Sequence, residues 1–137
     1  MAFACPSRTG SELPEAEPRI DLAGLAPQAQ RFGLAVELLL QALGFCYAVG
    51  YVANAAARGI EIGTLQMQVE GDLDVGNFLG LAGPRPGFTA IRATARVSSP
   101  NASEEQLRDL CQYVQDSSPV RDCLANPVPV KTTLELL

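Results

Sequence analysis

The chain has 137 residues, of which 47% are hydrophobic and 18% are charged, so we expect one well-cored domain rather than a disordered chain. The formal net charge of -5 argues against nucleic acid or an anionic membrane as a partner, because both bind basic surfaces. There is no histidine, and the four cysteines (Cys5, Cys46, Cys111 and Cys123) include no CxxC pair, so neither a metal site nor another cofactor is expected.

Residues 1–33 carry four prolines and scattered charges and show no clear periodicity. We expect them to form an atypical N-terminal region of a single domain that spans residues 1–137. Cys5, in this region, is interpreted as an exposed thiol without a role. No basic segment is followed here by an apolar run, so we expect no signal peptide and a location in the reducing cytoplasm, where thiols stay free.

Residues 35–58 form the only long apolar run, which contains no proline and predicts a helix. A stripe at helical spacing holds Cys46 at mid-length, and Glu37 and Tyr51 fall on the opposite side. The stripe consists of Leu39, Leu43, Cys46, Gly50, Ala53 and Ala57. A helix that is apolar nearly all round is either buried in protein or lies in a membrane. Polar side chains such as Glu37 make a membrane span costly, so we favour a central helix covered on several sides.

The next two segments alternate between apolar and polar residues. Residues 64–74 place Leu65, Met67, Val69 and Leu73 on one side, and residues 88–98 do the same with Ile91, Ala93, Ala95 and Val97. Such alternation predicts an antiparallel sheet with one face in water. Residues 76–87 are expected to form a loop or a short helical turn with Phe78, Leu79 and Leu81 tucked inward.

The C-terminal part predicts two short helices and a last strand. Ser103 and Gln106 match a capping box, and the helix that they open carries Cys111 on its apolar face, where we interpret it as a buried core thiol. Ser118, followed by proline, begins a second helix. Residues 127–137 alternate again and predict a strand. Because strands and helices do not alternate regularly, the order favours an α+β fold with an antiparallel sheet.

Several separated segments resemble the OsmC/Ohr family. From Gly33 the chain reads GLAVELLLQALGFCYAVGYVANAAARGIEIGTLQMQVEGDLD. This is similar to the family's E-L-L-x-x-A-L-x-x-C segment, which leads into R-G-I-x-I and an E-G-D-L-D strand. Near the C-terminus, SSPVRDCLANPVPVKTTLEL resembles the family's C-P-V-S-x-T-L-x-N-P-V-P-V. The resemblance implies an α+β fold built as an intertwined homodimer, with two long central helices enclosed by sheets. It also implies thiol-dependent reduction of organic hydroperoxides or hydrogen peroxide.

The resemblance assigns roles to two residues of the central helix. Cys46 matches the peroxidatic cysteine. Glu37 is the nearest match to a glutamate that orients an arginine beside the thiolate, although the family residue usually lies one position earlier, at Val36 here. Glu37 and Cys46 are nine residues apart and face opposite ways on one helix. If both serve one site, Glu37 must come from the partner subunit, so the geometry also calls for a dimer.

The chain departs from the family pattern at two places. Ser118 stands where the resemblance puts the second, resolving cysteine, and a serine hydroxyl cannot form that disulfide. Its position before Pro119 is sufficiently explained as a helix N-cap, and Cys123, five residues on, is a poor substitute. The arginine that should favour the Cys46 thiolate is unassigned. Arg19 and Arg8 are the candidates, followed by Arg31.

Two functions remain open. In the first, Cys46 acts as a one-cysteine thiol peroxidase in oxidative stress defence, and an external thiol reduces its sulfenic acid. In the second, a non-enzymatic protein of this fold binds an apolar ligand at the dimer interface or acts as a redox sensor. The retained Cys46 favours the first function, whereas the lost cysteine, the shifted glutamate and the unassigned arginine favour the second.

Overall fold

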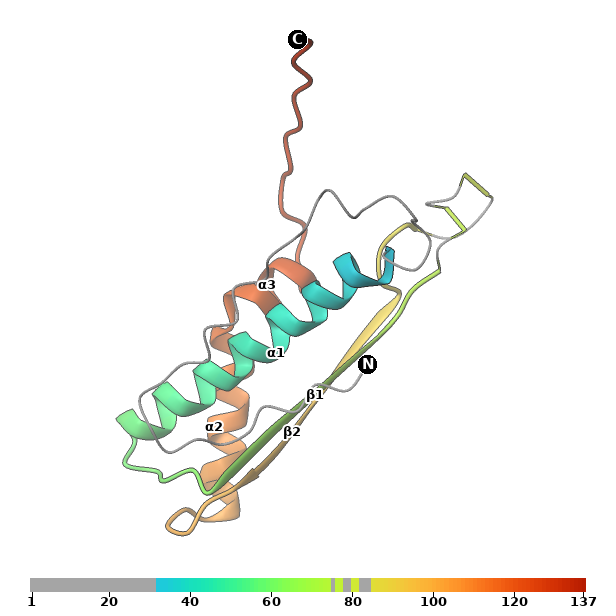
Figure 1. Ribbon diagram of the computed structural model, residues 1–137. Helices are drawn as coiled ribbons and strands as arrows, with labels where there is room; N and C mark the ends of the chain where they lie inside the picture. The colour runs from blue at the N-terminus through green and yellow to red at the C-terminus, as the bar shows by residue number, and fades with distance from the viewer. Residues whose placement is uncertain (1–31, 75, 78–79, 82–84) are drawn as a thin grey trace.

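The computed structural model describes residues 32–74, 76–77, 80–81 and 85–137. Its elements are, in chain order, α1 (Phe32–Ala57), β1 (Thr64–Asp72), β2 (Ala90–Ser98), α2 (Glu104–Ser117) and α3 (Pro119–Ala125). Helix α1 contacts β1 on one side and both α2 and α3 on another (Figure 1). The α+β class is confirmed. Cys5, like Arg8, Arg19 and Arg31, lies outside the described residues.

Helix α1 ends at Ala57, as the glycine at position 59 predicts. Gly59 adopts a φ of 66°, which places it in the left-handed region that glycine occupies without steric cost. The Ile60 N–H donates to the Ala55 carbonyl at 2.9 Å and the Gly59 N–H donates to the Ala56 carbonyl at 3.1 Å. This pair of bonds is a Schellman motif, which satisfies the last carbonyls of the helix and turns the chain toward β1.

The buried face of α1 differs from the predicted stripe. Tyr51, expected on the opposite side, is only 2% exposed, whereas Ala53 and Ala57 are exposed. The residues that α1 buries are Leu40, Leu43, Gly44, Tyr47, Ala48, Tyr51 and Ala55. A helix that is apolar all round gives no indication of its rotational phase, so the stripe could not be placed from periodicity.

The opposite face of α1 is uncovered within the described part of the chain. Phe45 is 37% exposed, and Val49 and Val52 are each more than half exposed. The expectation of a helix covered on several sides is therefore confirmed where α1 faces β1 and the C-terminal helices, but not for this face of the single chain. By length and composition alone, residues 35–57 could also cross a membrane, which is weak evidence because core helices of soluble proteins meet the same criterion.

Strands β1 and β2 pair antiparallel, with Met67 opposite Ala95 and Glu70 opposite Arg92. The inner face confirms the predicted alternation in β1, where Leu65, Met67 and Val69 are buried. In β2 the same pattern holds for Ile91, Ala95 and Val97, which pack against the core, but Ala93 is exposed. Leu81, expected to tuck inward from the loop between β1 and β2, is 65% exposed, and Phe78 and Leu79 of that loop lie outside the described residues.

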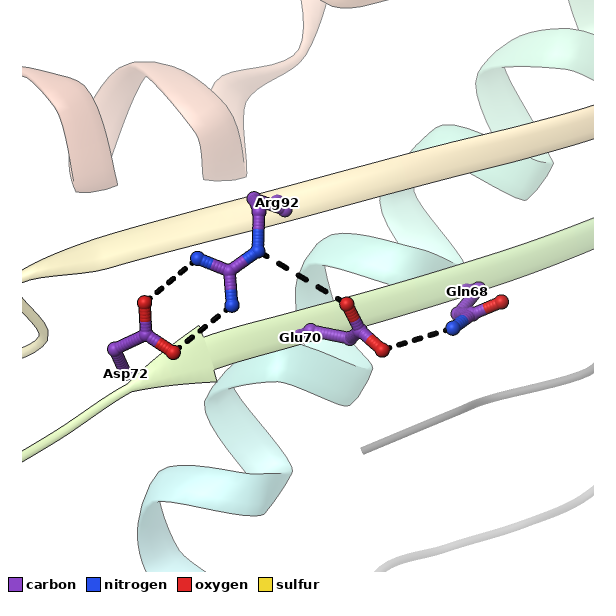
Figure 2. A network of polar contacts seen from close by, with 4 residues as sticks. All are labelled: Gln68, Glu70, Asp72 and Arg92. Atoms are coloured by element: carbon purple, nitrogen blue, oxygen red, sulfur yellow. Dashed lines mark hydrogen bonds and ion pairs between the residues drawn. The ribbon is translucent and has the colours of Figure 1, made fainter.

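The outer face of the sheet carries a polar network centred on Arg92 (Figure 2). Its guanidinium donates two hydrogen bonds to the Asp72 carboxylate, at 2.6 and 2.9 Å, and its Nε lies 3.9 Å from Glu70. Gln68 donates to the other oxygen of Glu70 at 2.9 Å. This face is thus the wet face of the predicted sheet.

The C-terminal helices confirm the predicted caps. Ser103 and Gln106 form the capping box of α2, and Ser118 caps α3 with proline at its first turn. Leu110 and Val114 are fully buried in the core. The strand predicted for residues 127–137 is wrong for the single chain, in which this segment runs away from the body (Figure 1). A strand requires a neighbouring strand edge, and the described part of this chain presents none beside it.

Candidate functional site

The packing of α1 against the α2–α3 junction brings Cys46 and Ser118 together. The Cys46 Sγ and the Ser118 Oγ lie 3.2 Å apart, within hydrogen-bond distance, although 72 residues separate them in the chain. Cys46 lies at mid-length of α1, half-buried, at the border between its buried face and its uncovered apolar face. The thiol is therefore fixed on one side by protein and adjoins a surface that the single chain leaves open.

Ser118 is held at the point where two helices meet. It is the C-cap of α2 and the N-cap of α3, and its side chain is in the protein interior, with only 5% of the residue exposed. Its Oγ accepts a hydrogen bond from the Arg121 N–H at 3.2 Å, and its carbonyl accepts one from the Asp122 N–H at 3.0 Å. The first of these bonds fixes the hydroxyl oxygen relative to α3.

Tyr47 lies in the electrostatic neighbourhood of the same thiol. Burial of its ring raises the pKa of the hydroxyl above 10.0, the charge of Arg121 opposes this shift, and the thiols of Cys46 and Cys111 add to it. The phenol therefore stays protonated at neutral pH. Arg121 is exposed, and its Nη1 also donates to the Gln115 carbonyl at 3.4 Å.

A second thiol, Cys111, packs on the core from α2. Its Sγ accepts a hydrogen bond from Gln115 Nε2 at 3.1 Å. Burial, aided by a hydrogen bond to Cys111, raises the pKa of Tyr51 well above its usual range. Cys111 is half-buried rather than fully buried, so the expected packing on the core is confirmed but its complete enclosure is not.

An open cleft of about 680 Å³, with both apolar and polar walls, lies between α1, β2 and the C-terminal helices. Tyr47, Tyr51, Cys111 and Arg121 bring polar groups to its walls, and Cys46 is not among the residues that line it. Its apolar walls come mainly from Leu39, Leu43, Met67, Phe88, Ile91 and Leu124. The cleft could take an apolar molecule or an apolar segment of protein.

The structure brings two of the predicted site residues together and keeps a third apart. Cys46 and Ser118 are in contact, whereas Glu37 is nine residues away on the same unbroken helix, about 13.5 Å along its axis. Arg19, Arg8 and Arg31 cannot be placed, because they precede the first described residue.

Tyr47 and Arg121 were missed by the sequence analysis. Arg121 follows Ser118 by three residues, so its backbone N–H is the expected partner of an N-cap, and that spacing could have indicated it. Tyr47 directly follows Cys46, but the sequence does not indicate that its side chain belongs to the site, since this depends on the rotational phase of α1. Among the described residues no cluster of three or more cysteine or carboxylate side chains could hold a metal ion.

Comparison with known proteins identifies the fold. A search of curated proteins finds no significant match. A solved structure, the OsmC like protein from Mycoplasma pneumoniae, is similar with a TM-score of 0.55 and 26% sequence identity. The match covers 64% of this chain and spans 59% of that one. The family model described as OsmC-like protein matches residues 35–133, which include the Cys46–Ser118 pair, both strands and all three helices from position 35 on. The chain belongs to the OsmC-like protein family.

Proposed function

We propose that the protein is a thiol-dependent peroxidase that reduces organic hydroperoxides or hydrogen peroxide through Cys46 alone, in defence against oxidative stress. The observation that carries this proposal is the placement of Cys46. Its sulfur touches a buried hydroxyl on one side and adjoins an uncovered apolar surface on the other. An apolar surface beside the thiol suits a hydroperoxide with a hydrocarbon chain.

The proposed reaction has two steps. In the first, the Cys46 thiolate attacks the terminal peroxide oxygen, an S–O bond forms, the O–O bond breaks, and the alkoxide leaves and takes up a proton to become the alcohol. In the second, two external thiols reduce the sulfenic acid to the thiol, and a disulfide of the external pair and one water are released. The external reductant is needed because Ser118, the group that Cys46 touches, cannot form a disulfide.

We propose further that the active form is a homodimer. The uncovered face of α1 presents Phe45, Val49 and Val52 to solvent, which is costly for an isolated chain of this size. Cys46 lies at the border of this face, so a second copy docked there would place the thiol, and the hydrocarbon chain of a hydroperoxide beside it, at the edge of an apolar interface. Glu37 of the partner subunit could then approach Cys46, which Glu37 of the same helix cannot.

The C-terminal segment supports the same proposal. Its apolar side chains are largely exposed in the single chain: Val128 at 53%, Val130 at 86%, Leu134 at 81% and Leu136 at 88%. Alternating apolar residues of this kind suit a strand that adds to the edge of another sheet. A monomeric mass by light scattering at micromolar concentration would contradict the dimer and the role in trans of Glu37.

We place this protein in a reducing cytoplasm, as a soluble protein with α1 in its core. The three described cysteines, Cys46, Cys111 and Cys123, are free thiols, which is the usual state in that compartment. The buried residues of α1 face β1 and α2 in the way that a core helix does. Purification in the soluble fraction without detergent is the expected result.

The peroxidase proposal is tested by mass spectrometry of the protein after treatment with hydrogen peroxide or cumene hydroperoxide in the presence of dimedone, which traps sulfenic acids. We expect one dimedone adduct, on Cys46, and consumption of peroxide when dithiothreitol is present. Cys46→Ser should abolish both, and the matched variant Cys123→Ser should leave both unchanged. The proposal fails if wild-type Cys46 stays a thiol under a large excess of hydrogen peroxide and also under a large excess of cumene hydroperoxide.

The cleft favours a second candidate function, the binding of an apolar ligand. Its volume and its walls of leucine, isoleucine and aromatic side chains suit such a molecule, and Cys46 does not line it. Saturable binding of the fluorescent probe 1-anilinonaphthalene-8-sulfonate, unchanged in Cys46→Ser and weakened in Ile91→Glu, would support it. Absence of saturable binding to the folded protein would exclude it.

A further inference from the structure

The hydroxyl of Ser118 is buried, and its hydrogen bonds divide into one that it accepts and one that it can donate. A backbone N–H is only a donor, so the oxygen must accept the bond from Arg121. A serine hydroxyl has two lone pairs and one proton, which leaves its proton for another acceptor. Among the groups that the structure describes, the acceptor within reach is the Cys46 Sγ, at 3.2 Å.

The direction of this second bond depends on the state of Cys46. In the neutral thiol, either group can donate to the other. In the thiolate, the sulfur has no proton, so the Ser118 hydroxyl must donate. Hydrogen bonds to a charged acceptor are roughly twice as strong as those between neutral groups, and they favour the charged form.

We propose that Ser118 is the hydrogen-bond donor that stabilises the Cys46 thiolate and fixes the position of its sulfur. This inference rests on the proposed function, in which that thiolate attacks the peroxide. It gives Ser118 a role at the reacting atom that is distinct from capping α3 and from forming a disulfide. The donor is preorganised, because the oxygen is fixed by the Arg121 N–H and Ser118 itself is only 5% exposed to water.

The titratable and charged groups that interact around this contact are Tyr47 and Tyr51 of α1, Cys111 of α2 and Arg121 of α3. Asp116 of α2 and Asp122 and Cys123 of α3 are exposed. Burial raises the pKa of both Tyr47 and Tyr51 above the 10.0 of an ordinary phenol, so both phenols stay largely protonated between pH 6 and pH 9. The pH dependence of Cys46 alkylation in this range therefore reports the thiol itself, provided that Cys111 is followed separately.

The test is the rate of Cys46 alkylation by iodoacetamide as a function of pH, resolved by peptide mass spectrometry. Ser118→Gly removes the hydroxyl but keeps most of the capping, because glycine is an acceptable N-cap. We expect the midpoint of its rate profile to rise by about 1 pH unit, the effect of losing one hydrogen bond to a charged group. Ser118→Thr, which keeps a hydroxyl, should restore the profile.

Ser118→Asp tests the hydrogen-bond donor to Cys46 separately from the N-cap of α3. Aspartate is among the best N-caps, so α3 is retained, but its carboxylate donates no proton and repels a thiolate. We expect its midpoint to rise more than that of Ser118→Gly. Ser117→Ala, at an exposed serine that bonds to the Tyr113 carbonyl, should leave the midpoint unchanged.

The inference is overturned if folded Ser118→Gly and Ser118→Asp both keep the wild-type midpoint, since Ser118 would then be a cap only. Circular dichroism checks that each variant is folded. The alkylation profile involves no peroxide, so its outcome is independent of the proposed function. A midpoint that depends on Ser118 in a protein that forms no sulfenic acid would overturn the peroxidase proposal and leave the hydrogen-bond donor in place.

Discussion

A Cβ atom on Gly50 of α1 would lie only 3.0 Å from Cγ1 of Val114 on α2, so the two helices meet here with a single side chain between their backbones. Cys46 lies one helical turn before Gly50, and Ser118 lies one turn after Val114. The helices run in opposite directions at this contact, which places Cys46 opposite Ser118. The close approach at Gly50 thus sets the distance between the thiol and the hydroxyl.

Gly50→Val should therefore destabilise the protein. Two branched methyl groups would overlap Val114, which is 1% exposed and has no room to move, and overpacking of this kind costs about 1–3 kcal/mol. The measurement is the free energy of unfolding in urea. Gly50→Ala is the matched control, since its higher helix propensity of about 1 kcal/mol offsets the smaller overlap. Equal stability of the two variants would show that the helices do not depend on this contact.

The local elements were predictable because their determinants lie close together in the chain. The capping box at Ser103, the stop at Gly59 and the alternation of Leu65, Met67 and Val69 each depend on residues within one turn or one strand. The rotational phase of α1 was not predictable, since apolar residues surround the whole helix. The segment 127–137 was predicted as a strand from a pattern that requires a partner, and the single chain supplies none.

The candidate site was only partly predictable for the same reason. Cys46 and Ser118 were singled out by resemblance to a family, but no spacing in the sequence indicates that residues 72 positions apart are in contact. The N-cap role of Ser118 follows from the proline after it and is confirmed. Its bond to the thiol depends on how α1 and α2 pack, which is a tertiary property. Arg121 and Tyr47 were missed because they join the site only through that packing.

The ion pair between Asp72 and Arg92 should make the free energy of unfolding decrease at acidic pH. The two hydrogen bonds from Arg92 hold the pKa of Asp72 below its usual 3.8 (Figure 2). Because the folded pKa is lowered, the pair contributes stability above pH 3.8 and loses it as the pH falls through the folded value. Asp72→Asn should therefore flatten the decline of stability below pH 4, by a small amount because the pair is exposed.

The measurement is the urea midpoint of unfolding between pH 2 and pH 7, in low salt and in 1 M salt. The difference between wild type and Asp72→Asn should shrink in high salt, since exposed charges are then screened. Asp109→Asn, at an exposed position of α2, serves as the control and should follow wild type. An identical acid decline for wild type and Asp72→Asn would contradict the role of the pair.

The described cysteines should differ in their rates of native labelling. Cys123 is exposed and should react first with a bulky maleimide. Cys111 should react more slowly, because it packs on the core beside Leu110 and accepts a hydrogen bond from Gln115. The measurement is peptide mass spectrometry of a labelling time course, with urea-unfolded protein as the control in which the difference disappears. Faster labelling of Cys111 than of Cys123 would show that α2 is packed differently.

Ser118→Cys should give the protein a resolving thiol. The side chains at positions 46 and 118 already touch, at 3.2 Å, so a sulfur in place of the hydroxyl would lie within reach of Cys46 if the Cα atoms are about 4.4–6.8 Å apart. After peroxide oxidises Cys46 to the sulfenic acid, the introduced thiol would attack its sulfur, form the disulfide and release water. The capping bond to Arg121 would be lost, which costs about 1 kcal/mol of stability.

The measurement compares wild type and Ser118→Cys over a series of peroxide concentrations, with intact mass and non-reducing peptide maps. Wild-type Cys46 should accumulate sulfenic acid and, at high peroxide, sulfinic acid, because its neighbour cannot trap the first oxidation state. Ser118→Cys should instead lose two hydrogen atoms in mass, yield one disulfide between positions 46 and 118, and show less sulfinic acid. Ser117→Cys, one residue away and exposed, should form no such bond and over-oxidise as wild type does. A Ser118→Cys protein that forms sulfenic acid at Cys46 but never the disulfide would show that the contact between α1 and the α2–α3 junction is not present in solution.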